Sequence, residues 1–144
     1  MKTEEEVSRM IQRVHEHIIE ELQQNTKTDI VFIITAIFLN FLTLAINSGF
    51  AQKEYKSGSD LFIISVLFAL AVIVNGAVIL GLSRGKQTRT KLLQGLIKMY
   101  KDKGVDGYYD MSLLANYNIR YNIFIAVVVF IGFASVAIPL AMMV

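Results

Sequence analysis

Residues 61–83 read LFIISVLFALAVIVNGAVILGLS and contain no charged side chain. A helix rises about 1.5 Å per residue, so a helix of this length crosses the roughly 30 Å hydrocarbon core of a bilayer. Residues 30–52 before it and 121–144 after it are likewise free of Asp, Glu, Lys, Arg and His. The sequence therefore predicts three transmembrane helices, and every other segment is placed relative to them.

The composition agrees with a helical membrane protein. Of the 144 residues, 54% are hydrophobic, and the mean hydropathy of +0.51 lies above that of ordinary soluble chains. Because lipid cannot satisfy open backbone groups, apolar segments of this length must be helical, and the predicted fold class is all-α. The chain contains no Cys, which excludes disulfides, thiolate metal sites and thiol nucleophiles.

An acidic amphipathic helix is expected before the first span. Its apolar side chains recur at spacings of four, three and four residues: Val7, Ile11, Val14 and Ile18. Thr3 is the expected N-cap, and the sequence NTKTD at residues 25–29 is expected to break the helix before the first span begins.

A basic amphipathic helix is expected after the second span. Seven of its side chains are positive and a single one is acidic between residues 84 and 103. Its apolar stripe consists of Leu92, Leu93, Leu96, Ile97 and Tyr100. Thr88 or Thr90 is expected to cap its start, and Gly104 to end it. The two amphipathic helices carry opposite charge, so each is suited to cover the other.

The distribution of Lys and Arg predicts the orientation. Four precede the first span, eight lie between the second and third spans, and two lie between the first and second. Twelve positive residues therefore fall on one side of a three-span protein and two on the other. The positive-inside rule then places the N-terminus in the cytoplasm and the C-terminus on the outer side.

These expectations divide the chain into four parts. They are an acidic cytosolic helix at 1–28, a transmembrane hairpin at 29–83 with spans 30–52 and 61–83, a basic cytosolic helix at 84–110, and an interfacial helix at 111–144 that continues into the third span. Four tyrosines are expected to anchor this part of the chain at the lipid headgroups: Tyr108, Tyr109, Tyr117 and Tyr121.

Polar residues in the spans are the first candidate for a functional surface. Asn40, Thr43 and Asn47 share one face of the first span, and Asn75 lies at a similar depth in the second. Two interpretations stay open. The residues either form hydrogen bonds between helices or line a hydrated, uncharged pore at the axis of a homo-oligomer.

Arg84, Lys86, Arg89 and Lys91 are the second candidate, as a surface that binds anionic lipid or a protein partner. Aromatic residues are not interleaved through the basic run, so nucleic acid is not an expected partner. His15 and His17 point about 200° apart on a helix and cannot chelate one ion together. We therefore expect no metal and no cofactor.

Two functions fit these patterns. No phosphate loop, catalytic motif or convergent carboxylate pair occurs in the sequence, so we expect no enzyme and assign no catalytic residue. The spans also lack the ionisable groups on which coupled carriers depend. One hypothesis is a homo-oligomeric passive ion channel, and the alternative is a non-conducting scaffold or accessory subunit that binds a cytosolic or membrane protein through its amphipathic helices.

Overall fold

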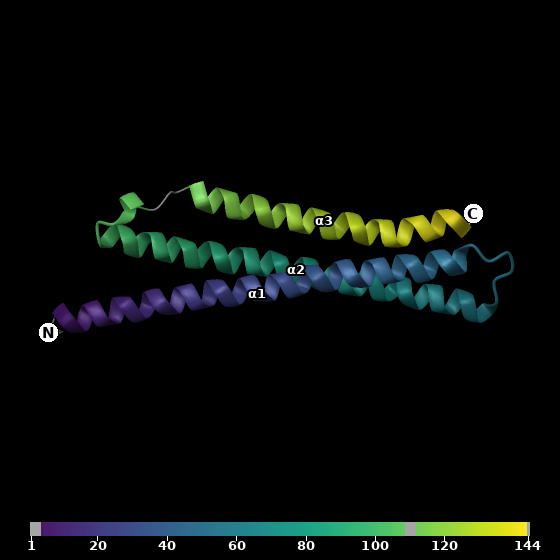
Figure 1. Ribbon diagram of the computed structural model, residues 1–144, viewed down its shortest axis with the longest axis horizontal. Coiled ribbons are helices and arrows are strands. Elements are labelled where there is room, and N and C mark those ends of the chain that lie inside the picture. The colour runs from purple at the N-terminus through teal and green to yellow at the C-terminus, as the bar shows by residue number, and fades with distance from the viewer. Residues whose placement is uncertain (1–3, 109–111, 144) are drawn as a thin grey trace.

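A computed structural model describes residues 4–108 and 112–143 of the chain. In these two ranges the chain forms helices and no strand (Figure 1). The elements are α1 (Glu4–Ala51), α2 (Gly58–Asp102), the short 3-10 helix η1 (Asp106–Tyr108) and α3 (Ser112–Met143). Of the described residues 93% are helical, which confirms the predicted all-α class. Thr3, the expected N-cap of α1, and Tyr109, one of the expected headgroup anchors, lie outside the described residues.

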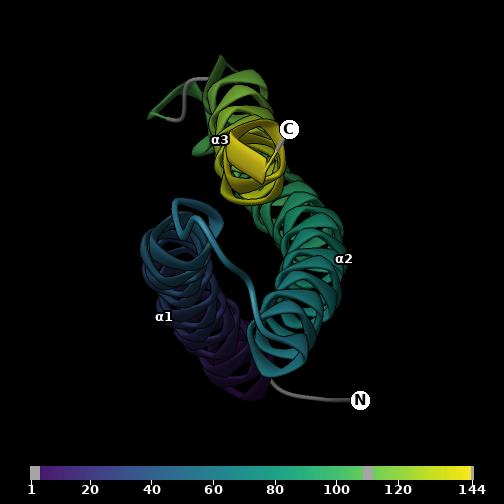
Figure 2. The ribbon, with the colours of Figure 1, turned by 90° about the vertical axis from the view of Figure 1, so that its right-hand side faces the viewer.

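The three long helices form one elongated bundle in which each helix contacts the other two (Figures 1 and 2). Each is long and apolar enough to cross a membrane. Large apolar side chains point outward from all three, such as Phe38 (65% exposed), Phe62 (70%) and Phe130 (72%). Exposure on this scale is costly in water and favourable against lipid tails. The fold is thus compatible with a multi-pass membrane protein.

The interior of the bundle is narrow. Its core consists of Ala36, Val78, Leu82 and Val128, one or two residues from each helix. Phe32 also packs against this core, and its ring lies so close to Gly81 that a Cβ there would come within 2.8 Å of it. A glycine on α2 therefore lets α1 approach closely.

The two amphipathic segments are not separate helices, and this prediction was wrong. α1 runs unbroken through residues 25–29, where Thr26 and Thr28 donate their hydroxyl hydrogens to the carbonyls of Leu22 and Gln24, at 2.9 and 3.1 Å. α2 likewise runs unbroken past Thr90, whose hydroxyl donates to the carbonyl of Lys86 at 2.9 Å. Bonds of this kind, to a carbonyl four residues back, satisfy the polar side chain without interrupting the helix.

The predicted end of α2 at Gly104 is confirmed. Gly104 has φ +68°, in the left-handed region that glycine enters without strain. Its N–H donates to the carbonyl of Lys101, and the N–H of Val105 donates to that of Tyr100, both at 3.0 Å. This is the Schellman arrangement, which pairs the last carbonyls of a helix.

α3 starts at Ser112 and continues without interruption, as predicted, with Pro139 accommodated inside it. It is the shortest of the three, with 32 residues against 48 in α1 and 45 in α2. At 1.5 Å per residue α1 is about 72 Å long, more than twice the thickness of the hydrocarbon core. In Figure 1, the N-terminal part of α1 and the C-terminal part of α2 extend side by side beyond the start of α3.

We call this extension the two-helix arm and define it as residues 4–18 of α1 and 95–102 of α2. A groove of about 310 Å³ runs between its two helices. At the edge of the arm, a ring nitrogen of His15 and the hydroxyl of Tyr100 share a hydrogen bond of 3.0 Å. The acidic and basic stretches therefore lie against each other, as parts of two long helices.

Candidate functional site

The polar residues predicted on the first span lie inside the bundle. Asn40, Thr43 and Asn47, which we call the polar stripe, are 2%, 3% and 0% exposed in the single chain. They share the buried face of α1 with Ala36. The stripe therefore points at α2 and α3 and away from the outer surface of the chain.

Asn40 joins all three helices. Its amide group and that of Asn75 on α2 donate to each other, with both bonds at 2.8 Å. The hydroxyl of Ser135 on α3 donates to the Asn40 side-chain oxygen at 3.0 Å. Asn75 is thus the partner of Asn40 within one chain. Within the stripe, Asn40 thus holds the three spans together through hydrogen bonds of the type that associates helices in lipid.

Asn47 is different, although it lies on the same face two turns further along. Its side chain is fully buried, and neither its nitrogen nor its oxygen has a hydrogen-bond partner among the described residues. Leaving a buried amide unpaired costs about 1–3 kcal/mol. Asn47 is the least satisfied polar group of the stripe.

A second polar cluster lies where the charge-free part of α1 begins. The hydroxyl of Tyr121 on α3 donates to the carboxylate of Asp29 on α1. The Asn25 amide donates to the Tyr121 hydroxyl at 3.1 Å and to the carbonyl of Gly85 on α2 at 3.0 Å. We call Asn25, Asp29, Gly85 and Tyr121 the boundary cluster.

Asp29 lies one residue before the first charge-free segment and is 6% exposed. Burial raises the pKa of its carboxyl group above the usual range, and the hydrogen bond from Tyr121 and the positive charge of Arg89 oppose part of that rise. Tyr121, predicted as a headgroup anchor, is instead buried at 3% exposure. The Tyr121 hydroxyl points inward because it binds the buried Asp29 carboxylate on α1. A partner on another helix cannot be predicted from the spacing of residues in α3.

The four basic residues predicted as one surface divide between two faces of α2. Arg89 points toward α1, where its guanidinium donates to the Thr26 hydroxyl at 2.6 Å and lies 4.6 Å from the centre of the Tyr117 ring on α3. Lys86 points toward α3 and donates to the Asn122 side chain at 2.9 Å. Lys86 and Lys91 line one cleft together, whereas Arg84 is exposed outside it.

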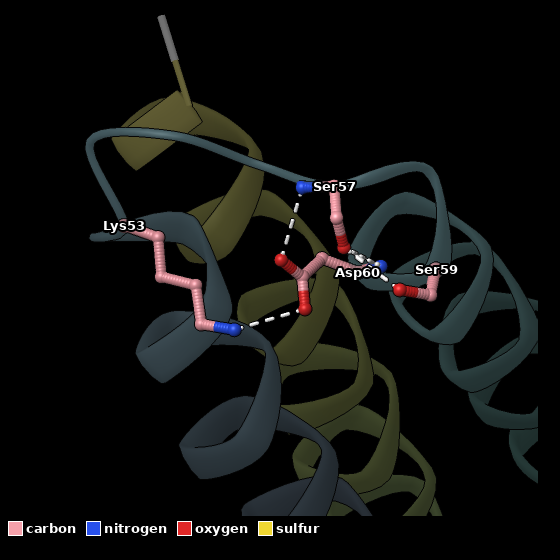
Figure 3. Close-up of polar contacts among 4 residues, drawn as sticks. All are labelled: Lys53, Ser57, Ser59 and Asp60. Carbon is pink, nitrogen blue, oxygen red and sulfur yellow. Dashed lines mark hydrogen bonds and ion pairs between the residues drawn. The ribbon is translucent and has the colours of Figure 1, made fainter.

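The opposite end of the bundle is held by a compact turn (Figure 3). Ser57 caps α2, and the carboxylate of Asp60 accepts a hydrogen from the Ser57 N–H at 3.1 Å and forms an ion pair of 2.9 Å with Lys53. These bonds lower the pKa of Asp60 below its usual value, the one from Lys53 most strongly. Asp60 therefore ties the turn that follows α1 to the start of α2.

The polar residues described above form hydrogen bonds and ion pairs between and within the helices. Over the described residues, no group of three or more His, Cys, Asp and Glu side chains is placed to hold a metal ion. No known protein family matches the chain, and no curated protein or solved structure is significantly similar to it. Function must therefore be argued from this chain's own residues.

Proposed function

We propose that the protein is a non-conducting, non-catalytic membrane scaffold whose three spans anchor a protein-binding arm on the cytosolic side. The observation that carries this proposal is the burial of the polar stripe, whose residues are at most 3% exposed in a single chain. Three helices enclose no solvated path by themselves, so a pore would need these residues to face a neighbouring subunit. Because the three side chains are buried inside a single chain, we infer that they serve the packing of the helices and not the lining of a pore.

The two-helix arm supplies the binding surface. Its groove is lined mainly by apolar side chains of α1 and α2, among them Ile11, Val14 and Met99. Val14 is 52% exposed although it belongs to the apolar stripe of the helix. A helix that presents such a stripe in water is stabilised by another helix laid against it.

We propose a second copy of the chain as the first partner of the arm. α1 carries Glu16, Glu20 and Glu21, whereas α2 carries Lys98 and Lys101 at the matching end of the bundle. A two-fold axis along the membrane normal would bring α1 of one copy against α2 of the other, so that acidic and basic helices alternate. The proposed assembly is a homo-oligomer.

The test combines a mass measurement with a flux measurement on the full chain in nanodiscs and liposomes. We expect a discrete mass of two or more copies, a Val14→Glu variant that is monomeric, and a Gln24→Glu variant that keeps the native mass. Gln24 is exposed on the same helix, so it controls for the added charge. Ion flux should equal that of empty liposomes. A monomeric wild type would contradict the second copy as partner.

The channel is the second candidate, and Asn47 is the observation that favours it. The Asn47 amide is 0% exposed and unpaired, so it could bind water molecules that fill a pore. The substitution Asn47→Leu separates the two functions. In a scaffold it removes an unpaired polar group and leaves stability unchanged or raised. If the protein is a channel, the wild type shows an ion flux and Asn47→Leu abolishes it. An ion flux through the wild type would contradict the scaffold proposal.

A further inference from the structure

A cleft of about 570 Å³ lies between α2 and α3 at the end of the bundle that carries the basic residues. Its α2 wall is one helical face that repeats every three or four residues: Ser83, Lys86, Gln87, Thr90, Lys91 and Gln94. Asn122 and Ile125 of α3 form the facing wall. The cleft is distinct from the groove of the arm, which lies between α1 and α2.

The position of the cleft matches the headgroup layer of a bilayer. Ser83 is the last residue of the charge-free stretch on α2, and Asn122 is close to the first residue of that on α3. From Ser83 to Gln94 the helix rises about 16 Å. The cleft therefore begins at the edge of the hydrocarbon core, where Ile125 offers an apolar surface, and extends into the layer that lipid phosphates occupy.

The charge of the cleft is positive and uncompensated by its own lining. The lining includes Lys86 and Lys91 but no Asp or Glu, and α3 has no acidic residue along its whole length. Lys86 donates to Asn122, whose amide oxygen is neutral. Arg89 is turned toward Thr26 on α1, and the Asp29 carboxylate binds Tyr121 within the boundary cluster, so neither is part of the cleft lining.

We propose that this cleft binds the phosphate headgroup of an anionic phospholipid, with Lys86 and Lys91 as the cationic contacts and Gln87 as a neutral hydrogen-bond donor. The acyl chains would lie along the exposed apolar surface of α2 and α3 below Ser83. This site is independent of the proposed scaffold function, since it uses neither the arm nor the polar stripe.

Native mass spectrometry of the purified full-length protein in detergent tests the site. Short-chain phosphatidylglycerol, short-chain phosphatidylcholine and inorganic phosphate are titrated separately. We expect saturable binding of phosphatidylglycerol at least about tenfold tighter than of phosphatidylcholine, because each lysine near an anionic headgroup adds to the attraction. Equal binding of the two lipids would overturn the proposal. If inorganic phosphate bound as tightly as phosphatidylglycerol, the ligand of the cleft would be a free anion and the lipid proposal would be rejected.

Matched variants locate the binding. Lys86→Gln/Lys91→Gln should weaken phosphatidylglycerol binding at least about tenfold, and Lys98→Gln/Lys101→Gln, with the same loss of charge on the arm, should change it less than about twofold. Lys91 is exposed, so Lys91→Gln alone tests the site without disturbing the Lys86 to Asn122 bond and should still weaken binding severalfold. If the cleft and arm variants lost equal affinity for phosphatidylglycerol, the lipid would be attracted by the overall positive charge of the protein, and the proposed site would be rejected.

Discussion

Asn40 and Asn47 are the same residue type on the same face of one helix, yet their surroundings differ completely. Asn40 uses its full hydrogen-bonding capacity: it donates to Ala36 and Asn75 and accepts from Asn75 and Ser135. Asn47 uses none of its own among the described residues. A buried amide with four hydrogen bonds stabilises a unique packing, whereas an unpaired one is a cost that another role must justify.

Replacing Asn40 tests the network at the residue scale. Asn40→Leu removes the reciprocal pair with Asn75 and leaves the Asn75 amide and Ser135 hydroxyl without this partner. Interhelical hydrogen bonds in lipid are worth about 0.6–2 kcal/mol each, so we expect the free energy of unfolding to fall by about 2 kcal/mol. Reversible unfolding in mixed micelles measures it.

The pairing itself is tested by the double variant Asn40→Leu/Asn75→Leu. Once both amides are gone, neither amide is left unpaired by loss of the other, so the loss should be smaller than the sum of the two single losses. Ser65→Ala is the control, since Ser65 is exposed and its hydroxyl donates to the carbonyl of Leu61 in its own helix. Additive single losses would show that the two amides do not depend on each other.

Asp60 gives a prediction for pH. Its pKa is lowered in the folded protein, so the stability it contributes is complete above the usual carboxyl pKa near 3.8 and is lost as the pH falls through the lower, folded value. We expect the melting temperature of Asp60→Asn to lie below that of the wild type at pH 7 and to converge with it in acid. Glu54→Gln, in the same turn, should follow the wild type throughout. A constant difference between Asp60→Asn and the wild type would contradict the titration of Asp60.

At the scale of helices, the sequence predicted the apolar segments correctly and their continuity wrongly. Asn25, Thr28 and Asp29 have the side chains that commonly cap or break helices, and local preference favours a break there. In the structure Thr28 donates to its own helix, and Asn25 and Asp29 bind groups on α2 and α3. Contacts with distant helices outweigh the local preference, and they cannot be read from the segment itself.

Two glycines on α2 form a matched pair that tests how α1 and α2 approach each other. A Cβ on Gly85 would lie 2.6 Å from the buried Asp29 carboxylate, whereas a Cβ on Gly95 would meet nothing within 4 Å. We expect Gly85→Ala to lower the free energy of unfolding by about 1–3 kcal/mol through overpacking. Gly95→Ala should raise it by up to about 1 kcal/mol, because alanine favours the helix.

Both variants are measured by unfolding in the same micelles. The contrast between them matters more than either value, since the chemical change is identical and both sites lie in one helix. Equal effects of the two substitutions would show that α1 does not press against α2 at Gly85.

At the scale of the whole molecule, periodicity showed which residues share a face but not what the face meets. The spacing of Asn40, Thr43 and Asn47 was visible in the sequence, yet burial against α2 and α3 appears only when three helices are assembled. Ser135 lies 95 residues from Asn40 in the chain and still binds it. The basic residues show the same limit, because one run of sequence supplies Lys86 to one face of α2 and Arg89 to another.

The predicted orientation of the bundle depends on charge, because among the described residues eleven Lys and Arg lie toward one end and two toward the other. The apolar part of α2 separates these two groups of basic residues. The turn at Tyr55 lies at one end of it, and the arm at Lys101 lies at the other. The positive-inside rule predicts that the arm is cytosolic and that the turn faces outward. A cytosolic arm is also what the scaffold proposal needs, since its partner must reach the groove.

Single cysteines test this orientation directly, because the chain has no Cys of its own. Tyr55 is 90% exposed and Lys101 is exposed, so a cysteine at either position is open to reagents. In intact cells, a membrane-impermeant maleimide should label Tyr55→Cys at once and Lys101→Cys only after permeabilisation. The reverse labelling pattern would show that the protein has the opposite orientation, with the arm outside the cell. Labelling of both from one side would mean that α2 does not cross the membrane, and the three-span arrangement would fail with it.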